Sequence, residues 1–145
     1  MISCLVYFNG NESSKKGLLR GVVIFPIFLI LNIIYLLITR KLHEKYTDSG
    51  DISIIKKAIF IVIAGVLIVS GLGVHNPPDS TKAIVYASLM GFVVYGIANC
   101  IMFSTNKKWN IMITFLDVLW GILSTGLLGY ILYKIVSKWP KVFEY

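Results

Sequence analysis

Four long apolar runs, separated by short polar blocks, dominate the pattern of residues along the chain. The runs cover residues 21–39, 58–74, 83–103 and 109–133, and the single charge inside them is Asp117. A helix that spans a membrane needs about 17 to 25 predominantly apolar residues, and each run has that length. The pattern predicts an all-α integral membrane protein, a bundle of four transmembrane helices with up-down-up-down topology.

The polar blocks divide the chain into a membrane domain with a short segment at each end. We expect a polar N-terminal extension over residues 1–17, the four-helix transmembrane domain over 18–136 and a short C-terminal tail over 137–145. Residues 40–46, "RKLHEKY", should continue the first helix into the lipid headgroups. Only "STNKK" joins the last two runs, so these helices should be antiparallel neighbours.

Composition and charge agree with a membrane protein. Hydrophobic residues make up 57% of the chain and charged residues 14%, and the mean hydropathy is +0.78. The net charge of +7 would suggest nucleic acid in a soluble protein, but lysines at helix ends lie naturally among lipid headgroups. We therefore expect the lipid bilayer as partner, with a second copy of the chain or other membrane proteins beside it, and no nucleic acid. Lysine and arginine divide evenly between the two loop sides, so the positive-inside rule favours neither orientation.

Polar side chains on three of the predicted helices lie at similar depths. Depths are counted from the side with loops 40–57 and 104–108, at about 1.5 Å per residue. On this count Asn32, Tyr95 and Asp117 lie about 10 to 12 Å deep, and Asn99 lies about 6 Å deep. Lipid cannot satisfy their hydrogen bonds, so they should turn inward. The sequence thus predicts a polar intramembrane cluster made of Asn32, Tyr95, Asn99 and Asp117.

Asp117 permits two interpretations. A carboxylate at the centre of a helix costs about 2.5 to 3.5 kcal/mol on insertion, whereas the apolar residues of the same segment return roughly 4 to 7 kcal/mol. The helix therefore inserts whether or not the acid has a function. In the structural interpretation, Asp117 is neutral and forms a hydrogen bond with Tyr95, Asn99 or Asn32 across the bundle. In the functional interpretation, it carries protons or binds a cation along an internal path.

Two segments in the second half of the chain carry a family resemblance. "GFVVYGIANC" and "TFLDVLWG" resemble the uncharacterised membrane proteins grouped as domain-of-unknown-function family 2177. Members typically show Tyr-Asp-x-Thr-Asn near the end of the third helix and Asp-x-x-Trp-Gly in the fourth. The resemblance is firm over residues 91–129, loose from residue 31 onward, and does not include residues 1–17. The matching positions are Tyr95, Asn99, Asp117, Trp120 and Gly121.

Departures from the family pattern favour the structural interpretation. Asn32 stands where the family usually has aspartate, Gly96 replaces the acid of the third-helix motif and Ala98 replaces its threonine. Only Asp117 remains of three family acids, so a path built from several carboxylates fits this member less well. The resemblance implies a multi-pass protein of a bacterial inner membrane, or of a viral or host membrane, since members occur in bacteria and some large DNA viruses. It implies no activity.

The function classes rank accordingly. The chain has two histidines, His43 and His75, and it has no G-x-S-x-G, no H-E-x-x-H and no cluster with metal-ligand spacing. We therefore expect no enzyme activity, no catalytic residue, no metal and no cofactor. The leading hypothesis is a structural or interaction protein with a hydrogen-bonded polar cluster inside the bundle. The alternative is a small proton- or cation-coupled transporter or channel using Asp117, and a membrane lipid-modifying enzyme is favoured least.

The topology itself can be tested. Four crossings return the chain to the side where it started, so both ends of the membrane domain should lie on one face. In a background without Cys4 and Cys100, Ser14→Cys and Ser137→Cys should react with a membrane-impermeant thiol reagent from the same side. Labelling of the two positions from opposite sides would contradict the four-helix topology.

Overall fold

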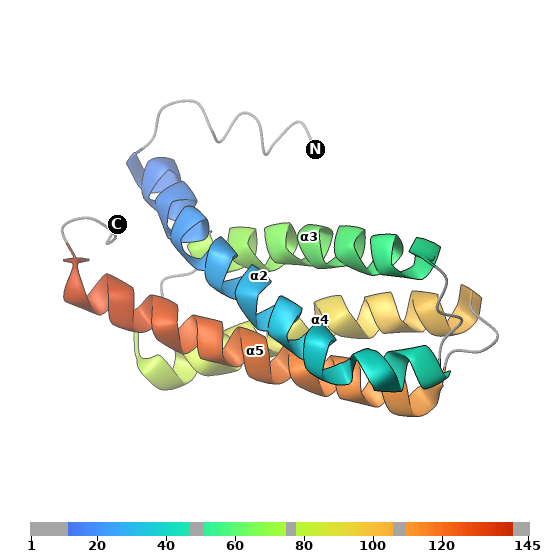
Figure 1. The fold of residues 1–145 in the computed structure, drawn as a ribbon. Coiled ribbons are helices and arrows are strands. Elements are labelled where there is room, and N and C mark those ends of the chain that lie inside the picture. Colours follow the sequence, from blue (N-terminus) through green and yellow to red (C-terminus); the bar gives the residue numbers. More distant parts are fainter. Residues whose placement is uncertain (1–11, 47–50, 75–77, 106–109, 141–145) are drawn as a thin grey trace.

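The computed structural model describes residues 12–46, 51–74, 78–105 and 110–140, which form four helices (Figure 1). They are α2 (Glu12–Tyr46), α3 (Asp51–Val74), α4 (Ser80–Thr105) and α5 (Ile111–Lys138). The all-α bundle of four helices that the apolar runs predicted is confirmed. The start of α2 and the end of α5 lie at the same end of the bundle, as up-down-up-down order requires (Figure 1).

Helix α2 is longer than its apolar run at both ends. It begins at Glu12, so the polar extension expected over residues 1–17 includes the first turns of this helix. At its other end it includes residues 40–46, as expected, and it continues through Pro26. The extra turns at this end bring His43 into the bundle, where it is buried.

Three helices are long and apolar enough to cross a membrane: Lys15–His43 within α2, α4, and α5. The described part of α3 has a shorter apolar stretch, Ala58–Gly73, about 24 Å long against a hydrocarbon core of about 30 Å. The whole of α3 has 24 residues, which is enough for about 36 Å. Large apolar side chains also cover the outside of the bundle: Leu37 is 69% exposed and Ile38 75%. Such a surface suits lipid and not water.

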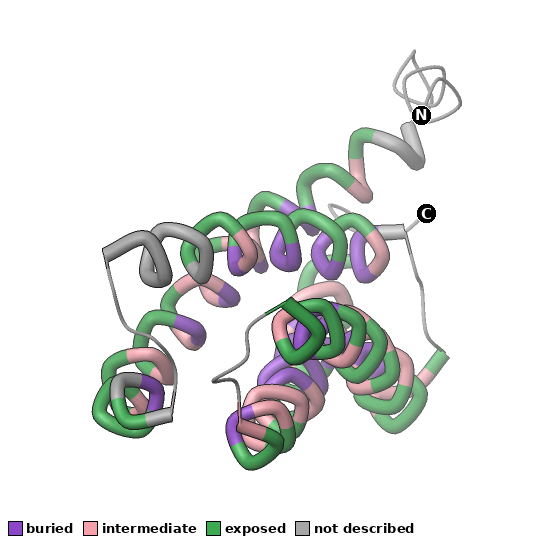
Figure 2. The backbone as a smooth tube through the Cα atoms, turned by 90° about the vertical axis from the view of Figure 1, so that its right-hand side faces the viewer, coloured by how far each residue is buried: buried purple, intermediate pink, exposed green. Residues whose placement is uncertain are grey.

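The helices are arranged as two antiparallel hairpins, α2–α3 and α4–α5. The contacts between α4 and α5 are the most extensive, followed by those between α2 and α3. Contacts from one hairpin to the other, α2 with α5 and α3 with α4, are fewer. Buried residues line the inward sides of the helices, where the hairpins face one another (Figure 2).

Small residues form the seam between α4 and α5. Gly91 on α4 lies so close to α5 that a Cβ there would meet the Gly121 carbonyl oxygen and Thr125 Oγ1. At the next contact, a Cβ on Gly129 would lie 2.6 Å from the Ala83 carbonyl oxygen. Lipid tails are as apolar as leucine, so close backbone packing supplies much of the attraction between helices in a membrane. The seam therefore holds the α4–α5 hairpin together.

The α2–α3 hairpin combines aromatic packing with a buried cation. Gly65 receives the rings of Phe25 and Phe28, because a Cβ there would come within 2.9 Å of both. Arg20 is fully buried, and its guanidinium donates to the Gly73 carbonyl oxygen at 3.5 Å. A positive charge beside the last carbonyls of a helix is favourable. Arg20 therefore stabilises the end of α3.

The seam predicts a contrast between two glycines of α4. Gly91→Ala should force α4 and α5 apart and lower stability by about 1 to 3 kcal/mol, as overpacking does. Gly96 is the matched control, because a Cβ there meets nothing within 4 Å, and Gly96→Ala should cost nothing. Thermal unfolding in detergent measures both. Equal stability of the two variants would contradict the seam.

Candidate functional site

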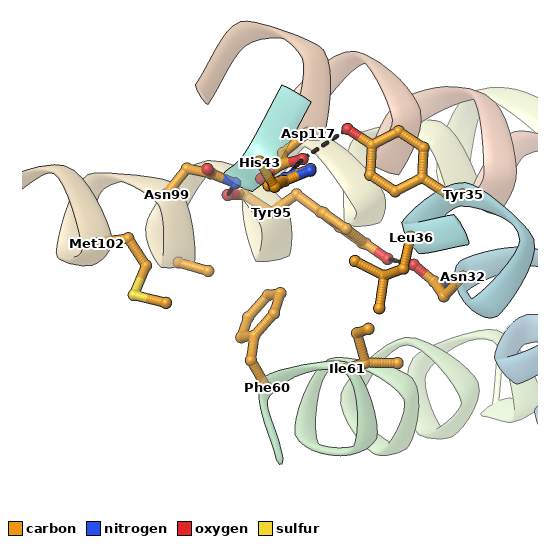
Figure 3. A pocket seen from close by; sticks show the side chains of 11 residues that line it. Asn32, Tyr35, Leu36, His43, Phe60, Ile61, Tyr95, Asn99, Met102 and Asp117 are labelled. Carbon is orange, nitrogen blue, oxygen red and sulfur yellow. Dashed lines mark hydrogen bonds and ion pairs between the residues drawn. The ribbon is translucent and has the colours of Figure 1, made fainter. Parts of the chain in front are cut away.

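A cleft lies between the two hairpins, toward the C-terminal ends of α2 and α4. It offers about 50 Å³ to water-sized molecules, where one water needs about 10 to 15 Å³. All four helices contribute to its wall, and α3 contributes the apolar Phe60 and Ile61. Its polar wall, which we call the polar lining, consists of Asn32, Tyr35, His43, Tyr95, Asn99 and Asp117 (Figure 3).

Helical spacing places these side chains on shared faces. On α2, Asn32, Tyr35, Thr39 and His43 follow at intervals of three, four and four residues, which is the spacing of one helix face. On α4, Tyr95 and Asn99 are four residues apart. Asn110 caps α5, because its side chain accepts from the Met112 N–H at 2.8 Å. Asp117 therefore lies about 9 Å along the axis from Ile111, inside the bundle.

Asp117 contacts α2, and this corrects the partner expected from the sequence. Tyr35 Oη donates to Asp117 Oδ1 at 2.6 Å, and His43 Nε2 lies 3.3 Å from the same oxygen. The hydrogen bond goes to Tyr35 and not to Tyr95, Asn99 or Asn32. The Asp117 side chain is 15% exposed, so the carboxylate depends on protein donors.

A second hydrogen bond joins the hairpins deeper in the bundle. Tyr95 Oη donates to Asn32 Oδ1 at 2.5 Å, and the Asn32 amide donates to the Phe28 carbonyl oxygen at 2.9 Å. Both side chains are almost fully buried. The four residues expected to cluster thus line one cleft, but as two separate groups: Asn32 and Asn99 with Tyr95, and Asp117 with Tyr35 and His43.

Asn99 is fixed by one bond and leaves its other polar atom buried. Its Nδ2 donates to the Tyr95 carbonyl oxygen at 3.0 Å. Its Oδ1 is buried and has no hydrogen-bond partner among the described residues. Because Asn99 is only 4% exposed and lines the cleft, this oxygen is an acceptor inside the site (Figure 3).

Sequence reasoning missed two members of the site, Tyr35 and His43. The basic segment "RKLHEKY" suggested a headgroup location, but the His43 residue is 5% exposed. Its Nδ1 lies 3.1 Å from the Thr39 carbonyl oxygen. A carbonyl can only accept, so Nδ1 carries the proton of this bond. The four-residue spacing from Thr39, continued from Asn32 and Tyr35, was the signal that could have found His43.

The remaining family-motif residues support the polar lining. Tyr35 stacks on Trp120, with ring centroids 4.8 Å apart and planes at 9°. Gly121 makes room for Tyr95, since a Cβ there would lie 2.5 Å from Tyr95 Cγ. Phe60 packs edge-on against Tyr95 at 5.8 Å. The Asp-x-x-Trp-Gly motif thus supplies the acid, a platform for the tyrosine that contacts it, and space for a second tyrosine.

Comparisons with known proteins identify a family and no activity. The model of the family described as "Predicted membrane protein (DUF2177)" matches residues 18–133. No curated protein and no solved structure matches the chain. Within the part of the chain that the structure describes, no three or more side chains of the types His, Cys, Asp and Glu lie together in a group that could hold a metal ion.

The two hydrogen bonds between the hairpins predict similar losses of stability when either tyrosine is replaced. Tyr35→Phe and Tyr95→Phe keep the rings but remove the donors to Asp117 and Asn32, so each should lower stability. The expected loss is about 0.6 kcal/mol and at most about 1.7 kcal/mol, the range of cross-helix bonds in membranes. Tyr130→Phe is the control, because Tyr130 lies outside the cleft and its ring can still face Lys134. Thermal unfolding of all three variants in detergent measures these losses of stability. If Tyr35→Phe and Tyr95→Phe lose no more stability than Tyr130→Phe, the two hydrogen bonds between the hairpins are contradicted.

Proposed function

The chain belongs to the DUF2177 family of predicted membrane proteins, and we propose that it is a structural or interaction protein of the membrane. In this proposal, hydrogen bonds of the polar lining hold its two hairpins in register. The observation that carries the proposal is the direction of these bonds. Tyr35 with Asp117, and Tyr95 with Asn32, each connect hairpin α2–α3 to hairpin α4–α5.

The packing of the bundle supports this role. Each hairpin has its own close contacts, the small-residue seam in one and the Phe25, Phe28 and Gly65 contact in the other. The hairpins touch one another less extensively, so directional bonds have more influence on how they dock. A slipped arrangement would take the Asp117 carboxyl group away from its Tyr35 donor.

A non-enzymatic role agrees with the buried hydroxyls of α5. Thr125 Oγ1 donates to the Gly121 carbonyl oxygen at 2.6 Å, and Ser124 Oγ lies 3.4 Å from the same atom. Bonded into their own helix, these hydroxyls are not held by a general base as a catalytic nucleophile would be. The partners that we propose are the lipid bilayer and, along the apolar outer faces, a second copy or other membrane proteins.

A second candidate is a cation-coupled transporter or channel that uses Asp117. The specific observation in its favour is that Asp117 lines a cleft large enough for a few waters or a small ion. In this alternative the carboxylate would attract the cation, and the amide oxygens of the polar lining would replace part of its hydration shell.

Two substitutions of Asp117 separate these roles. Asparagine can still accept from Tyr35 and should cause a modest loss of stability, whereas leucine leaves the Tyr35 hydroxyl unpaired and should do worse, by up to about 2 kcal/mol. Thermal unfolding of wild type, Asp117→Asn and Asp117→Leu in detergent with a metal chelator should follow that order. Leucine at or above the stability of wild type would contradict the structural role.

Ion flux in liposomes tests the second candidate with the same proteins. The structural proposal expects no cation flux from wild type or either variant. Wild-type flux that Asp117→Asn abolishes, without any change in stability, would replace the structural proposal by the transport one.

A further inference from the structure

We propose that the cleft binds one divalent transition-metal ion of the zinc type between His43 Nε2 and Asp117 Oδ1, with Asn99 Oδ1 as a third ligand. The inference goes beyond the structural role and does not depend on it. It starts from two side chains on different hairpins, His43 on α2 and Asp117 on α5, whose metal-binding atoms face one another.

The distance between these atoms matches shared coordination. His43 Nε2 and Asp117 Oδ1 are 3.3 Å apart, longer than the about 2.7 to 2.9 Å of a charge-assisted hydrogen bond. Zinc bonds of about 2.0 to 2.1 Å to nitrogen and oxygen, meeting at a tetrahedral angle, hold the two ligand atoms about 3.3 Å apart. An ion bound to both atoms would therefore require little movement of either helix.

The protonation of His43 agrees with this role. Its Nδ1 proton is directed to the Thr39 carbonyl oxygen at 3.1 Å. A ring whose Nδ1 side is engaged by a carbonyl binds a metal through Nε2, the atom that lies 3.3 Å from Asp117 Oδ1. A histidine that binds a metal almost always donates its other ring N–H to a carbonyl or carboxylate in this way.

The carboxylate is also held in place from behind. Tyr35 Oη donates to Asp117 Oδ1 at 2.6 Å, and its ring stacks on Trp120. A carboxylate oxygen has lone pairs for both a hydrogen bond and a metal bond. Such a hydrogen bond orients a ligating carboxylate and raises metal affinity.

Asn99 supplies a further oxygen on a third helix. Its Nδ2 is committed to the Tyr95 carbonyl oxygen, whereas its buried Oδ1 has no hydrogen-bond partner in the described part of the chain. Asn99 lines the same cleft as His43 and Asp117 (Figure 3). The volume of about 50 Å³ leaves room for water ligands that complete the shell.

The donor set selects the kind of ion. Imidazole nitrogen with carboxylate oxygen suits zinc and its neighbours in the first transition row. Magnesium prefers six oxygens in an octahedron with bonds of about 2.0 to 2.1 Å, and calcium takes six to eight oxygens. A histidine in the shell disfavours both, so Mg²⁺ and Ca²⁺ should not compete at equal concentration.

Zinc titration of the full chain tests the site. Wild-type protein, stripped with a chelator and purified in detergent, should bind one Zn²⁺ per chain in calorimetry and in competition with a chromophoric chelator. His43→Ala and Asp117→Asn should each weaken binding at least about tenfold, and Tyr35→Phe, which removes only the supporting hydrogen bond, about 10- to 100-fold. Asn99→Asp should bind more tightly, since it adds a charged ligand, and misfolding cannot mimic such a gain.

Matched controls come from the rest of the chain. His75→Ala changes the only other histidine, and Asp79→Asn changes an acid that pairs with Lys82 outside the cleft; both should bind zinc as wild type does. Co²⁺ bound to wild type should give the visible absorption of a tetrahedral nitrogen–oxygen site, a readout that needs no variant. Absence of stoichiometric binding to wild type, an octahedral cobalt spectrum, loss of binding in His75→Ala, or unchanged binding in both ligand variants would overturn the proposal.

Discussion

A carboxylate inside a membrane bundle must find its donors on neighbouring helices, because lipid supplies none. For Asp117 the donor is Tyr35, which comes from the other hairpin. That requirement determines which faces of α2 and α5 turn toward one another. The rest of the cleft follows from it: His43 arrives on the same face of α2, and Trp120 supports the Tyr35 ring from α5.

The bundle uses two kinds of helix contact, and they do different work. Between α4 and α5, glycines let the two backbones approach so closely that a Cβ at the glycine would meet atoms of the facing helix. Such packing gives close contact but little discrimination between neighbouring registers, since small residues recur every few positions. Between the hairpins, the bonds of Tyr35 and Tyr95 are individually weak, yet each is made at one position only. Different residues thus serve the two purposes. Small residues allow close packing within a hairpin, and the two tyrosines determine the register in which the hairpins dock.

Much of this architecture could be predicted from the residues. Apolar runs of membrane-spanning length indicated four helices, and the lack of hydrogen-bonding partners in lipid indicated that Asn32, Tyr95, Asn99 and Asp117 face inward. The pairing could not be predicted, because it depends on side-chain reach. Tyr35 lies nearer the membrane surface than Asn32, but its long ring carries the hydroxyl to Asp117. His43 was misjudged for a similar reason: it flanks an apolar run, and only the packing of neighbouring helices buries it.

The bond between Tyr35 and Asp117 joins residues that are 82 positions apart in the chain, which has a consequence for biosynthesis. At a translation rate of about 5 to 20 residues per second, α2 would wait about 4 to 16 seconds before Asp117 is made. During that interval the hydroxyl of Tyr35 faces the insertion machinery or lipid without the partner that it has in the bundle, and the side-chain oxygen of Asn32 likewise lacks Tyr95 until 63 further residues are made. The first half of the nascent protein is therefore a natural client for whatever shelters polar membrane segments until the last helix is released.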